Sequence, residues 1–99
     1  MNVAQIYKKW DIPFILIGSG KVVPRSYAIR VIENIINDGF VLLGYDAFAV
    51  LADGKRCPVI DSDASFSRAH QPSAQDIGNS IKDDPPEISH YEFVFMAEE

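Results

Sequence analysis

The hydrophobic positions of the chain recur with helical spacing most clearly in residues 24–38. Apolar side chains stand there at every third or fourth position, and polar ones fall between them, as on an amphipathic helix. Pro24 suits the first turn because its φ angle is already close to the helical value, and Gly39 suits the position after the last turn. The pattern therefore predicts one well-defined helix, whose buried stripe is formed by Ala28, Val31, Ile32, Ile35 and Ile36.

Two shorter helices are predicted from capping signals. Asn2 and Gln5 have the spacing of a capping box, and the apolar residues that follow them recur with a helical period. Ser73 begins another helix, and the Pro85-Pro86 pair ends it because proline cannot continue a helix. The chain thus contains three predicted helices.

The remaining apolar runs are short and predict strands. Asp53-Gly54 is typical of a two-residue hairpin turn, so residues 47–52 and 55–60 should pair with each other. Residues 90–97 carry apolar side chains on both faces, which indicates a strand in the middle of a sheet. Further strands are predicted at residues 40–43 and 64–67, and residues 12–17 form either a strand or an apolar connector.

These elements predict a single domain, residues 1–99, of the α+β class. Hairpins join most of the predicted strands, so the sheet should be antiparallel, with about four or five strands. The two or three helices should then pack on one face of this sheet. No internal repeat and no linker interrupts the sequence.

Acidic residues outnumber basic ones and are concentrated in the second half of the chain, and the net charge is −5. Residues 1–45 hold five basic and three acidic side chains, a balance of +2, whereas residues 46–99 hold four and eleven, a balance of −7. A surface with this bias repels nucleic acid and attracts a basic partner. The alternative interpretation is that the acidic side chains only keep the protein soluble.

The sequence shows no feature of a secreted or membrane protein. Cys57 is its only cysteine, and a lone thiol forms no internal disulfide. The longest apolar run, residues 12–17, is far too short to cross a bilayer. We therefore expect a cytoplasmic protein that binds no membrane, and the sequence leaves its oligomeric state open.

The sequence lacks the residue patterns of common enzyme and metal sites. Gly18-Ser19-Gly20-Lys21 matches part of a phosphate-binding loop, but the other glycine and the final hydroxyl residue of that loop are missing. His70 and His90 could act as acid and base in RNA cleavage, but the acidic second half offers few cations to hold phosphate. One cysteine and two histidines are too few for a zinc site. No catalytic residue, metal ion or cofactor is therefore predicted.

Three segments together resemble a known family of proteins. They read Leu43-Gly44-Tyr45-Asp46, then Ile60-Asp61-Ser62-Asp63-Ala64-Ser65-Phe66, and then Ile81-Lys82-Asp83-Asp84 before the aromatic last strand. This order is similar to that in the immunity proteins of the tRNA-cleaving group-E colicins, type five, and in the immunity families of bacterial polymorphic toxin systems. The similarity covers roughly residues 24–97, and the Asp-Ser-x-Ala-Ser-aromatic segment is its most specific part.

The resemblance implies a protein that binds and inhibits a cationic RNA-cleaving toxin and is not itself an enzyme. In this family the immunity protein occupies the RNA-binding cleft of the toxin and mimics the nucleic acid. A tRNase holds phosphates with Lys and Arg and stacks bases on side chains, so carboxylates and rings can replace both. The candidate phosphate mimics are Asp46, Asp61 and Asp63, the candidate base mimics are Phe48 and Phe66, and Ser62 and Ser65 are candidates for hydrogen bonds at the rim.

The chain departs from the family pattern in three places. Phe66 stands where the colicin immunity proteins have tryptophan, residues 1–23 extend beyond the pattern, and the hairpin around Asp53-Gly54 is longer. We therefore expect this chain to share the general role of the family, but its toxin need not be the one that the colicin immunity proteins bind.

Each candidate residue also has a purely structural interpretation. Asp61-Ser62-Asp63 can form a turn whose side chains bind backbone amides, and Asp46 can shape another turn. Phe48 and Phe66 can belong to the core. Two other classes of protein also stay open, a regulatory module that binds a small molecule or peptide, and a small ribonuclease.

Overall fold

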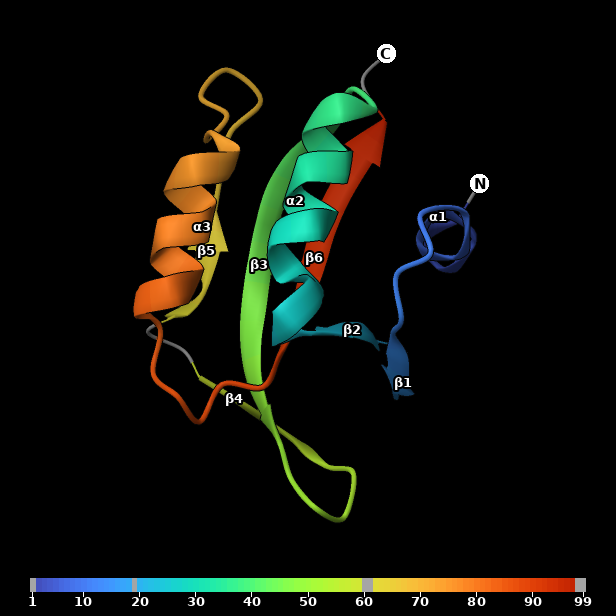
Figure 1. Ribbon diagram of the computed structural model, residues 1–99, viewed down its shortest axis with the longest axis vertical. Helices are drawn as coiled ribbons and strands as arrows, with labels where there is room; N and C mark the ends of the chain where they lie inside the picture. Colours follow the sequence, from blue (N-terminus) through green and yellow to red (C-terminus); the bar gives the residue numbers. More distant parts are fainter. Residues whose placement is uncertain (1, 19, 60–61, 98–99) are drawn as a thin grey trace.

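The computed structural model describes residues 2–18, 20–59 and 62–97, and its architecture is of the α+β class that the sequence predicts (Figure 1). The helices are α1 (Val3–Lys9), α2 (Ala28–Asn37) and α3 (Ala74–Asp83), and a 3-10 turn (Arg25–Tyr27) precedes α2. The strands are β1 (Ile15–Ile17), β2 (Gly20–Pro24), β3 (Phe40–Val50), β4 (Arg56–Pro58), β5 (Ala64–Ser65) and β6 (His90–Ala97). None of the helices in the described part of the chain is long and apolar enough to reach across a membrane.

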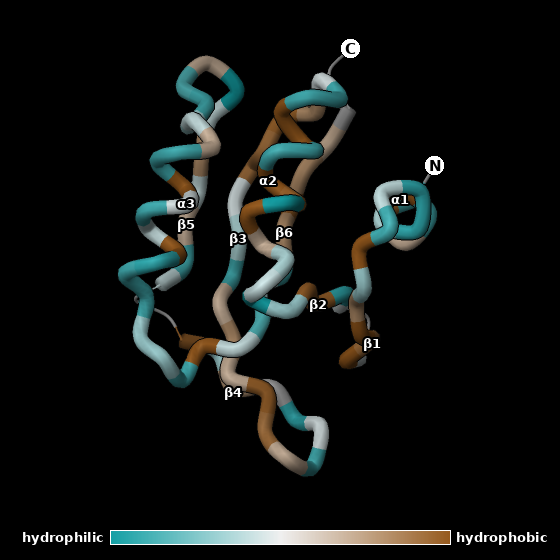
Figure 2. The backbone as a smooth tube through the Cα atoms, in the orientation of Figure 1, coloured by the Kyte–Doolittle hydropathy of each residue, from teal (hydrophilic) through white to brown (hydrophobic). Residues whose placement is uncertain are grey.

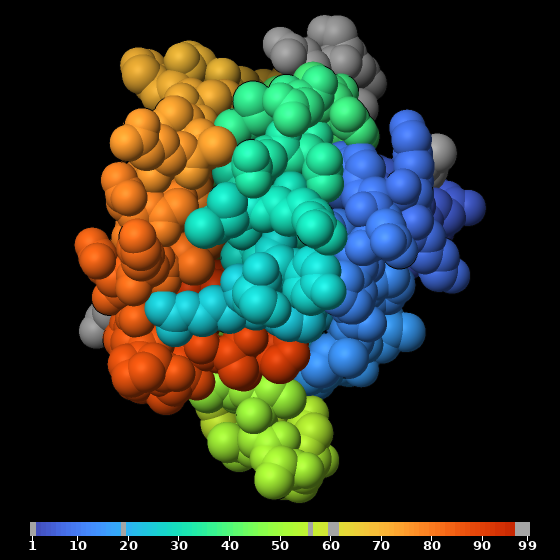
Figure 3. Space-filling model, viewed as in Figure 1, coloured from blue at the N-terminus to red at the C-terminus, as the bar shows by residue number. Residues whose placement is uncertain are grey.

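The strands form one curled antiparallel sheet, with α2 and α3 in front of it in Figure 1. Their order is β1-β2-β6-β3-β4, and β5 pairs with β3 beside this path. β6 lies between β2 and β3, so the prediction of a strand in the middle of the sheet is confirmed. The hairpin between β3 and β4 projects from the lower end of the molecule, where Figure 3 shows it beyond the helices.

β3 is a single strand where the sequence predicts two. The predicted strands, residues 40–43 and 47–52, were separated by residues 44–46, but β3 runs through these residues without a break. The strand stays in the sheet because an irregularity between Leu42 and Gly44 adds one residue to β3 opposite β6. A side chain at Gly44 would overlap the carbonyl oxygen of Ala64 in β5, so the close approach of β5 requires glycine here.

The predicted apolar stripe of α2 faces the core, with two corrections. Hydrophobic and polar positions alternate along α2 in Figure 2, and Ile36 is 45% exposed. It lies about 100° round the helix from Ile35, at the margin of the stripe. Pro24 ends β2 and does not begin the helix, because its extended ψ angle of 141° leads the chain into the 3-10 turn first. The buried residues of the stripe are Ala28, Val31, Ile32 and Ile35.

The first part of the chain, whose role the sequence leaves open, supplies part of the core. The indole ring of Trp10 stacks on Phe95 with 5.8 Å between ring centroids. Its Nε1–H donates to Asp38 Oδ2 at 2.7 Å. α1 is therefore attached both to the sheet and to the end of α2. The buried side chains that precede α2 are Ile6, Tyr7, Ile12, Val22 and Val23.

Arg25 joins the start of α2 to the end of α3. Its Nη1 donates to the carbonyl oxygens of Pro85 (2.8 Å) and Ile88 (3.1 Å). Its Nη2 donates to the carbonyl oxygens of Ile81 (2.6 Å) and Asp84 (2.9 Å). The last carbonyl groups of a helix lack partners in a further turn, so this guanidinium group adds donors at the end of α3. Because these partners lie 56 to 63 residues later in the chain, no local pattern indicated the contact.

We predict that Gly44→Ala destabilises the protein, because its methyl group would overlap a backbone oxygen of β5. Overpacking of this kind costs about 1–3 kcal/mol. Gly78→Ala is the matched control, since its methyl group would meet Ile29 at an ordinary contact distance of 3.7 Å. This control should stabilise α3 by about 0.5–1 kcal/mol. Urea unfolding measures both variants, and a Gly44→Ala protein as stable as wild type would contradict the close approach of β5.

We predict that Tyr7→Phe alters stability mainly at high pH. The Tyr7 hydroxyl is buried with no hydrogen-bond partner among the described residues, and burial, with a smaller effect of Glu92, raises its pKa. Below about pH 10 the tyrosine is protonated in both states, so the variant should be at least as stable as wild type. Above pH 10 the unfolded state alone releases the proton, so wild type should lose up to about 1.4 kcal/mol per pH unit relative to the variant. Urea unfolding from pH 8 to 11 tests this, and parallel curves for the two proteins would refute it.

Candidate partner-binding surface

Asp63, Asp83 and Asp84 come together where β5 meets the end of α3, and Asp46 and Glu92 are paired on the neighbouring strands β3 and β6. Asp63 precedes β5, Asp83 and Asp84 follow one another at the end of α3, and Asp46 and Glu92 lie in β3 and β6. We refer to these five residues as the acidic edge. The segment before β5 and the end of α3 lie side by side in Figure 1, and residues of both line the same hollow.

This hollow has a volume of about 330 Å³ and opens between Asp63, Asp83 and Asp84. Its lining offers carboxylate and hydroxyl oxygens, which suit the positively charged head of an Arg or Lys side chain. The side chains of Tyr45, Ser62 and Ser80 complete its walls.

Two buried tyrosines lie close to Asp84. The Tyr91 hydroxyl donates to Asp84 Oδ2 at 2.5 Å. Burial raises the pKa of Tyr91, and the hydrogen bond to Asp84 raises it further. Burial and then the Asp84 carboxylate raise the pKa of Tyr45 as well. Both hydroxyl groups therefore stay protonated at neutral pH, and that of Tyr91 acts as a neutral hydrogen-bond donor to Asp84.

Asp63 also binds the backbone N–H of Ala47, which pairs with neither β4 nor β5. Along its outer edge, β3 pairs with β5 at Gly44 and Tyr45 and with β4 from Phe48 onward, which leaves Ala47 between them. The backbone N–H of Ala47 donates to Asp63 Oδ1 at 3.0 Å. This contact agrees with the structural interpretation of Asp63, in which its side chain binds a backbone amide. The residue is nevertheless exposed, so it can contact a partner as well.

Gln71 holds the loop after β5 to the same strand. Its Oε1 accepts from the backbone N–H of Leu42 at 2.8 Å, and its Nε2 donates to the Leu42 carbonyl oxygen at 2.9 Å. The side-chain amide thus takes the place of a paired strand. The segment that carries Ser62, Asp63 and Ser65 is therefore fastened to β3 both before and after β5.

Asp46 and Glu92 are direct neighbours across β3 and β6. Their side chains point away from the helices, because Tyr45, Tyr91 and Phe93 beside them belong to the core and side chains alternate along a strand. Both residues are half-buried. The acidic edge thus continues from the hollow onto the face of the sheet opposite the helices.

The two predicted aromatic mimics contribute to the interior of the protein. Phe48 is only 5% exposed, so its ring is not available to imitate a base. Phe66 is half-buried, and its ring centroid lies 6.2 Å from that of Tyr45. Among the other predicted residues, Ser62 lines the hollow, Ser65 is exposed on β5, and Asp61 lies outside the described residues.

Five residues of this surface, Tyr45, Ser80, Asp83, Asp84 and Glu92, were not predicted as site residues. The alternation of residues 90–97 could have identified Glu92, since Tyr91 and Phe93 on either side of it share the apolar face. Tyr45, Asp83 and Asp84 stand in the segments that carry the family resemblance, but nothing in their local spacing indicated that packing between distant segments would place them beside Asp63.

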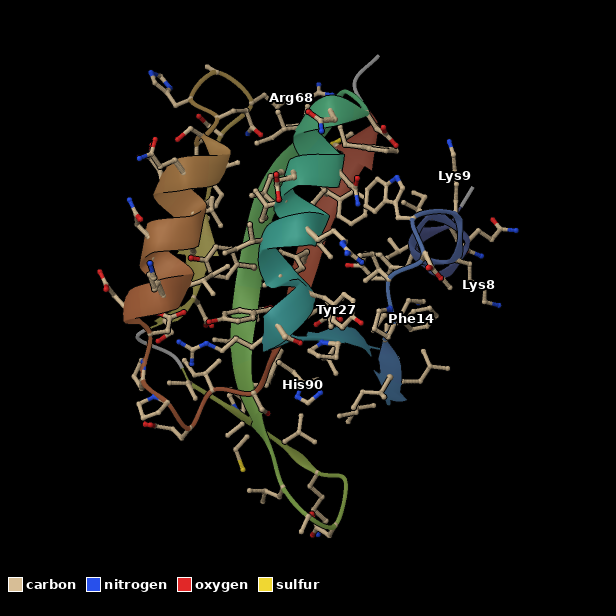
Figure 4. All side chains as sticks on the ribbon, in the orientation of Figure 1. Lys8, Lys9, Phe14, Tyr27, Arg68 and His90 are labelled. Carbon is tan, nitrogen blue, oxygen red and sulfur yellow. The ribbon has the colours of Figure 1, made fainter. Side chains whose placement is uncertain are left out.

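The structure does not bring the two histidines together. His70 precedes α3 and His90 follows it, and this helix of ten residues is about 15 Å long. Figure 4 shows His90 at the lower end of the sheet and Arg68, two residues before His70, at the upper end. Burial lowers the pKa of His90, and its Nδ1 lies 2.8 Å from Ser89 Oγ. Within the described ranges, no three His, Cys, Asp or Glu side chains are placed to share a metal ion.

A second hollow, of about 500 Å³, lies between α2 and α3. It is the place where a regulatory module would bind a small molecule or peptide. Its walls combine the apolar Ile29 with the charged side chains of Arg25, Glu33 and Lys82. This mixture matches no single class of ligand, whereas the acidic edge matches a cation.

We predict that Asp63→Ala lowers the free energy of unfolding by about 1–2 kcal/mol, because the buried N–H of Ala47 would lose its acceptor. Asp63→Asn keeps an oxygen acceptor and removes the charge, so it should cost less than about 0.5 kcal/mol. Urea unfolding at neutral pH compares the two variants. If both variants lose the same free energy of unfolding, the effect comes from the charge of Asp63. If neither variant loses stability, Asp63 does not stabilise β3.

A fold of this class supports many unrelated functions, so the fold alone does not assign one. The acidic edge is the feature from which a function must be argued. No protein-family model, no curated protein and no solved structure matches this chain.

Proposed function

We propose that this protein is an immunity protein that binds a cationic RNA-cleaving toxin and blocks its RNA-binding cleft with the acidic edge. The observation that carries the proposal is the meeting of Asp63, Asp83 and Asp84 at one hollow. Carboxylates gathered in this way can pair with the Lys and Arg side chains that otherwise hold the phosphates of RNA. The protein itself performs no chemistry in this proposal, because occupation of the cleft is enough to inhibit.

The hydroxyl groups around the carboxylates favour an arginine of the toxin. A guanidinium group presents several N–H donors in one plane, which carboxylate and hydroxyl oxygens can accept together. Ser62 and Ser80 line the hollow beside the carboxylates. Asp84 is already oriented by Tyr91, so less side-chain freedom is lost when a partner binds.

The lysines of α1 and the carboxylates at the end of α3 lie at opposite sides of the molecule. Lys8 and Lys9 project from α1 in Figure 4, whereas Asp83 and Asp84 lie at the end of α3, across the sheet from α1 in Figure 1. Because the net charge is −5, a cationic partner is attracted over a distance, and the carboxylates at the end of α3 should help to orient its approach. Added salt should therefore slow association much more than it speeds dissociation.

The resemblance to colicin immunity proteins supports the same role but not the same set of contacts. The proposed contact set keeps Asp46, Asp63, Ser62 and Ser65. It adds Asp83, Asp84 and Glu92, which belong to the acidic edge, and it leaves out the buried Phe48. In this protein, mimicry of RNA would thus depend on charge and hydrogen bonds more than on stacking of aromatic rings.

The direct test of the proposal is inhibition of tRNA cleavage. The purified chain is mixed with the product of the gene immediately upstream, or with tRNase domains of the group-E colicin type, and cleavage of tRNA is followed on gels. We expect full inhibition at about an equimolar ratio. Unchanged cleavage with all of these toxins would contradict the proposal, and RNA cleavage by the chain alone would favour the ribonuclease alternative.

We predict that Asp83→Lys weakens binding to an inhibited toxin by about tenfold or more, equivalent to ~1.4 kcal/mol, because it places a like charge at the hollow. Asp83 is exposed, so the fold should tolerate the change. Glu33→Lys is the matched control, since it alters net charge equally on the exposed side of α2 and should change affinity less than about threefold. Surface plasmon resonance measures both. Equal losses would mean that net charge, and not the acidic edge, governs binding.

A further inference from the structure

One face of the sheet carries exposed apolar side chains on its central strand. Tyr91, Phe93 and Phe95 of β6 face the helices and belong to the core. Val94 and Met96 alternate with them on the opposite face, where they are 48% and 40% exposed. The face of an antiparallel sheet that meets water is normally polar, so the apolar residues at this place offer a surface that another molecule can cover.

The cross-strand neighbours of Val94 leave it accessible. Val94 lies opposite Gly44 in β3, and Gly44 in turn lies opposite Ser65 in β5. Glycine has no side chain to shield Val94, and a larger residue is excluded because it would overlap β5. The sheet surface across these three strands therefore carries little side-chain bulk. The apolar group of Val94 lies at one end of the row and the hydroxyl of Ser65 at the other.

The next row along the same two central strands is formed by Asp46 and Glu92. Asp46 is adjacent to Ala47, whose backbone N–H is bound by Asp63. The exposed apolar residues thus lie beside the acidic edge, and a partner large enough to cover one would reach the other. We refer to Val94, Met96 and Ser65 as the open face.

We infer that the open face is the second half of the toxin-binding surface, and this inference rests on the proposed function. The occupant is the cationic toxin domain, with apolar side chains on Val94 and Met96 and basic ones on the neighbouring carboxylates. A second copy of the chain fits less well. A twofold contact through this face would bring together two chains that each have a net charge of −5.

The test uses a double variant and a control of equal charge. Val94→Lys with Met96→Lys removes the apolar groups and places cations against a cationic partner. Ile29→Lys with Ile36→Lys makes the same charge change on α2, where the two side chains are similarly exposed at 46% and 45%. Affinity is measured by surface plasmon resonance for the toxin domain that wild type inhibits, and circular dichroism with urea unfolding checks that each variant folds.

We expect the open-face pair to weaken binding by about 30-fold or more and the α2 pair by less than about threefold. Val94→Thr with Met96→Gln is the milder variant, in case lysine disturbs the strand, and should still cost about fivefold. Inhibition by wild type together with unchanged affinity of both open-face variants would overturn the inference and leave the proposed function standing. A wild type that inhibits none of the toxins would instead overturn the proposed function.

A separate measurement tests whether the open face binds a second copy of the chain. Light scattering gives the mass of wild type and of the open-face variants at the same concentrations. A wild-type dimer that becomes monomeric in Val94→Lys with Met96→Lys would overturn the inference, because the open face would then belong to a second copy. A wild type that is monomeric at the concentrations used for binding supports the toxin as the occupant.

Discussion

The pairing of β3 with β6 determines both the core and the proposed binding surface. Eight residue pairs join the two strands, from Phe40–Ala97 to Phe48–His90. Because side chains alternate between the two faces, a shift of one residue would exchange the buried aromatic side chains for the charged ones. The same register that places Tyr45 beside Phe93 under the helices places Asp46 beside Glu92 on the other face. The carboxylates are therefore as firmly positioned as the core.

Polar side chains complete the structure at points where regular pairing ends. Arg25 binds the last carbonyl groups of α3, Asp63 binds the N–H of Ala47, and Gln71 binds both backbone groups of Leu42. Buried backbone groups must find partners, and these contacts provide them without further strands. They also hold the end of α3 and the segment around β5 in place, and these two segments form the hollow. The groups that stabilise the fold thus lie beside those of the proposed binding surface, and the side chain of Asp63 belongs to both.

The parts of the fold that depend on local patterns could be predicted from the sequence. The capping box of α1, the stripe of α2 and the central place of β6 follow from spacing over a few residues. The continuity of β3 could not be predicted, because Gly44 indicates a break unless the crossing of β5 is known. For the site, the sequence offered Asp63 and Ser62 as candidates, and tertiary packing brings Asp83 and Asp84 to the same hollow. Phe48 was offered both as a base mimic and as a core residue, because nothing in its local sequence distinguishes the two, and the structure buries it.

The acidic edge and the open face would make different contributions to one complex. Charges attract a partner over several ångströms and orient it, but solvent and salt weaken exposed ion pairs once contact is made. Apolar contacts act only at short range, yet burying side chains such as Val94 and Met96 slows dissociation. An inhibitor that must reach a toxin before RNA does, and then stay bound, needs both properties. The register of β3 and β6 places them side by side, since Glu92 and Val94 are successive outward residues of the same strand.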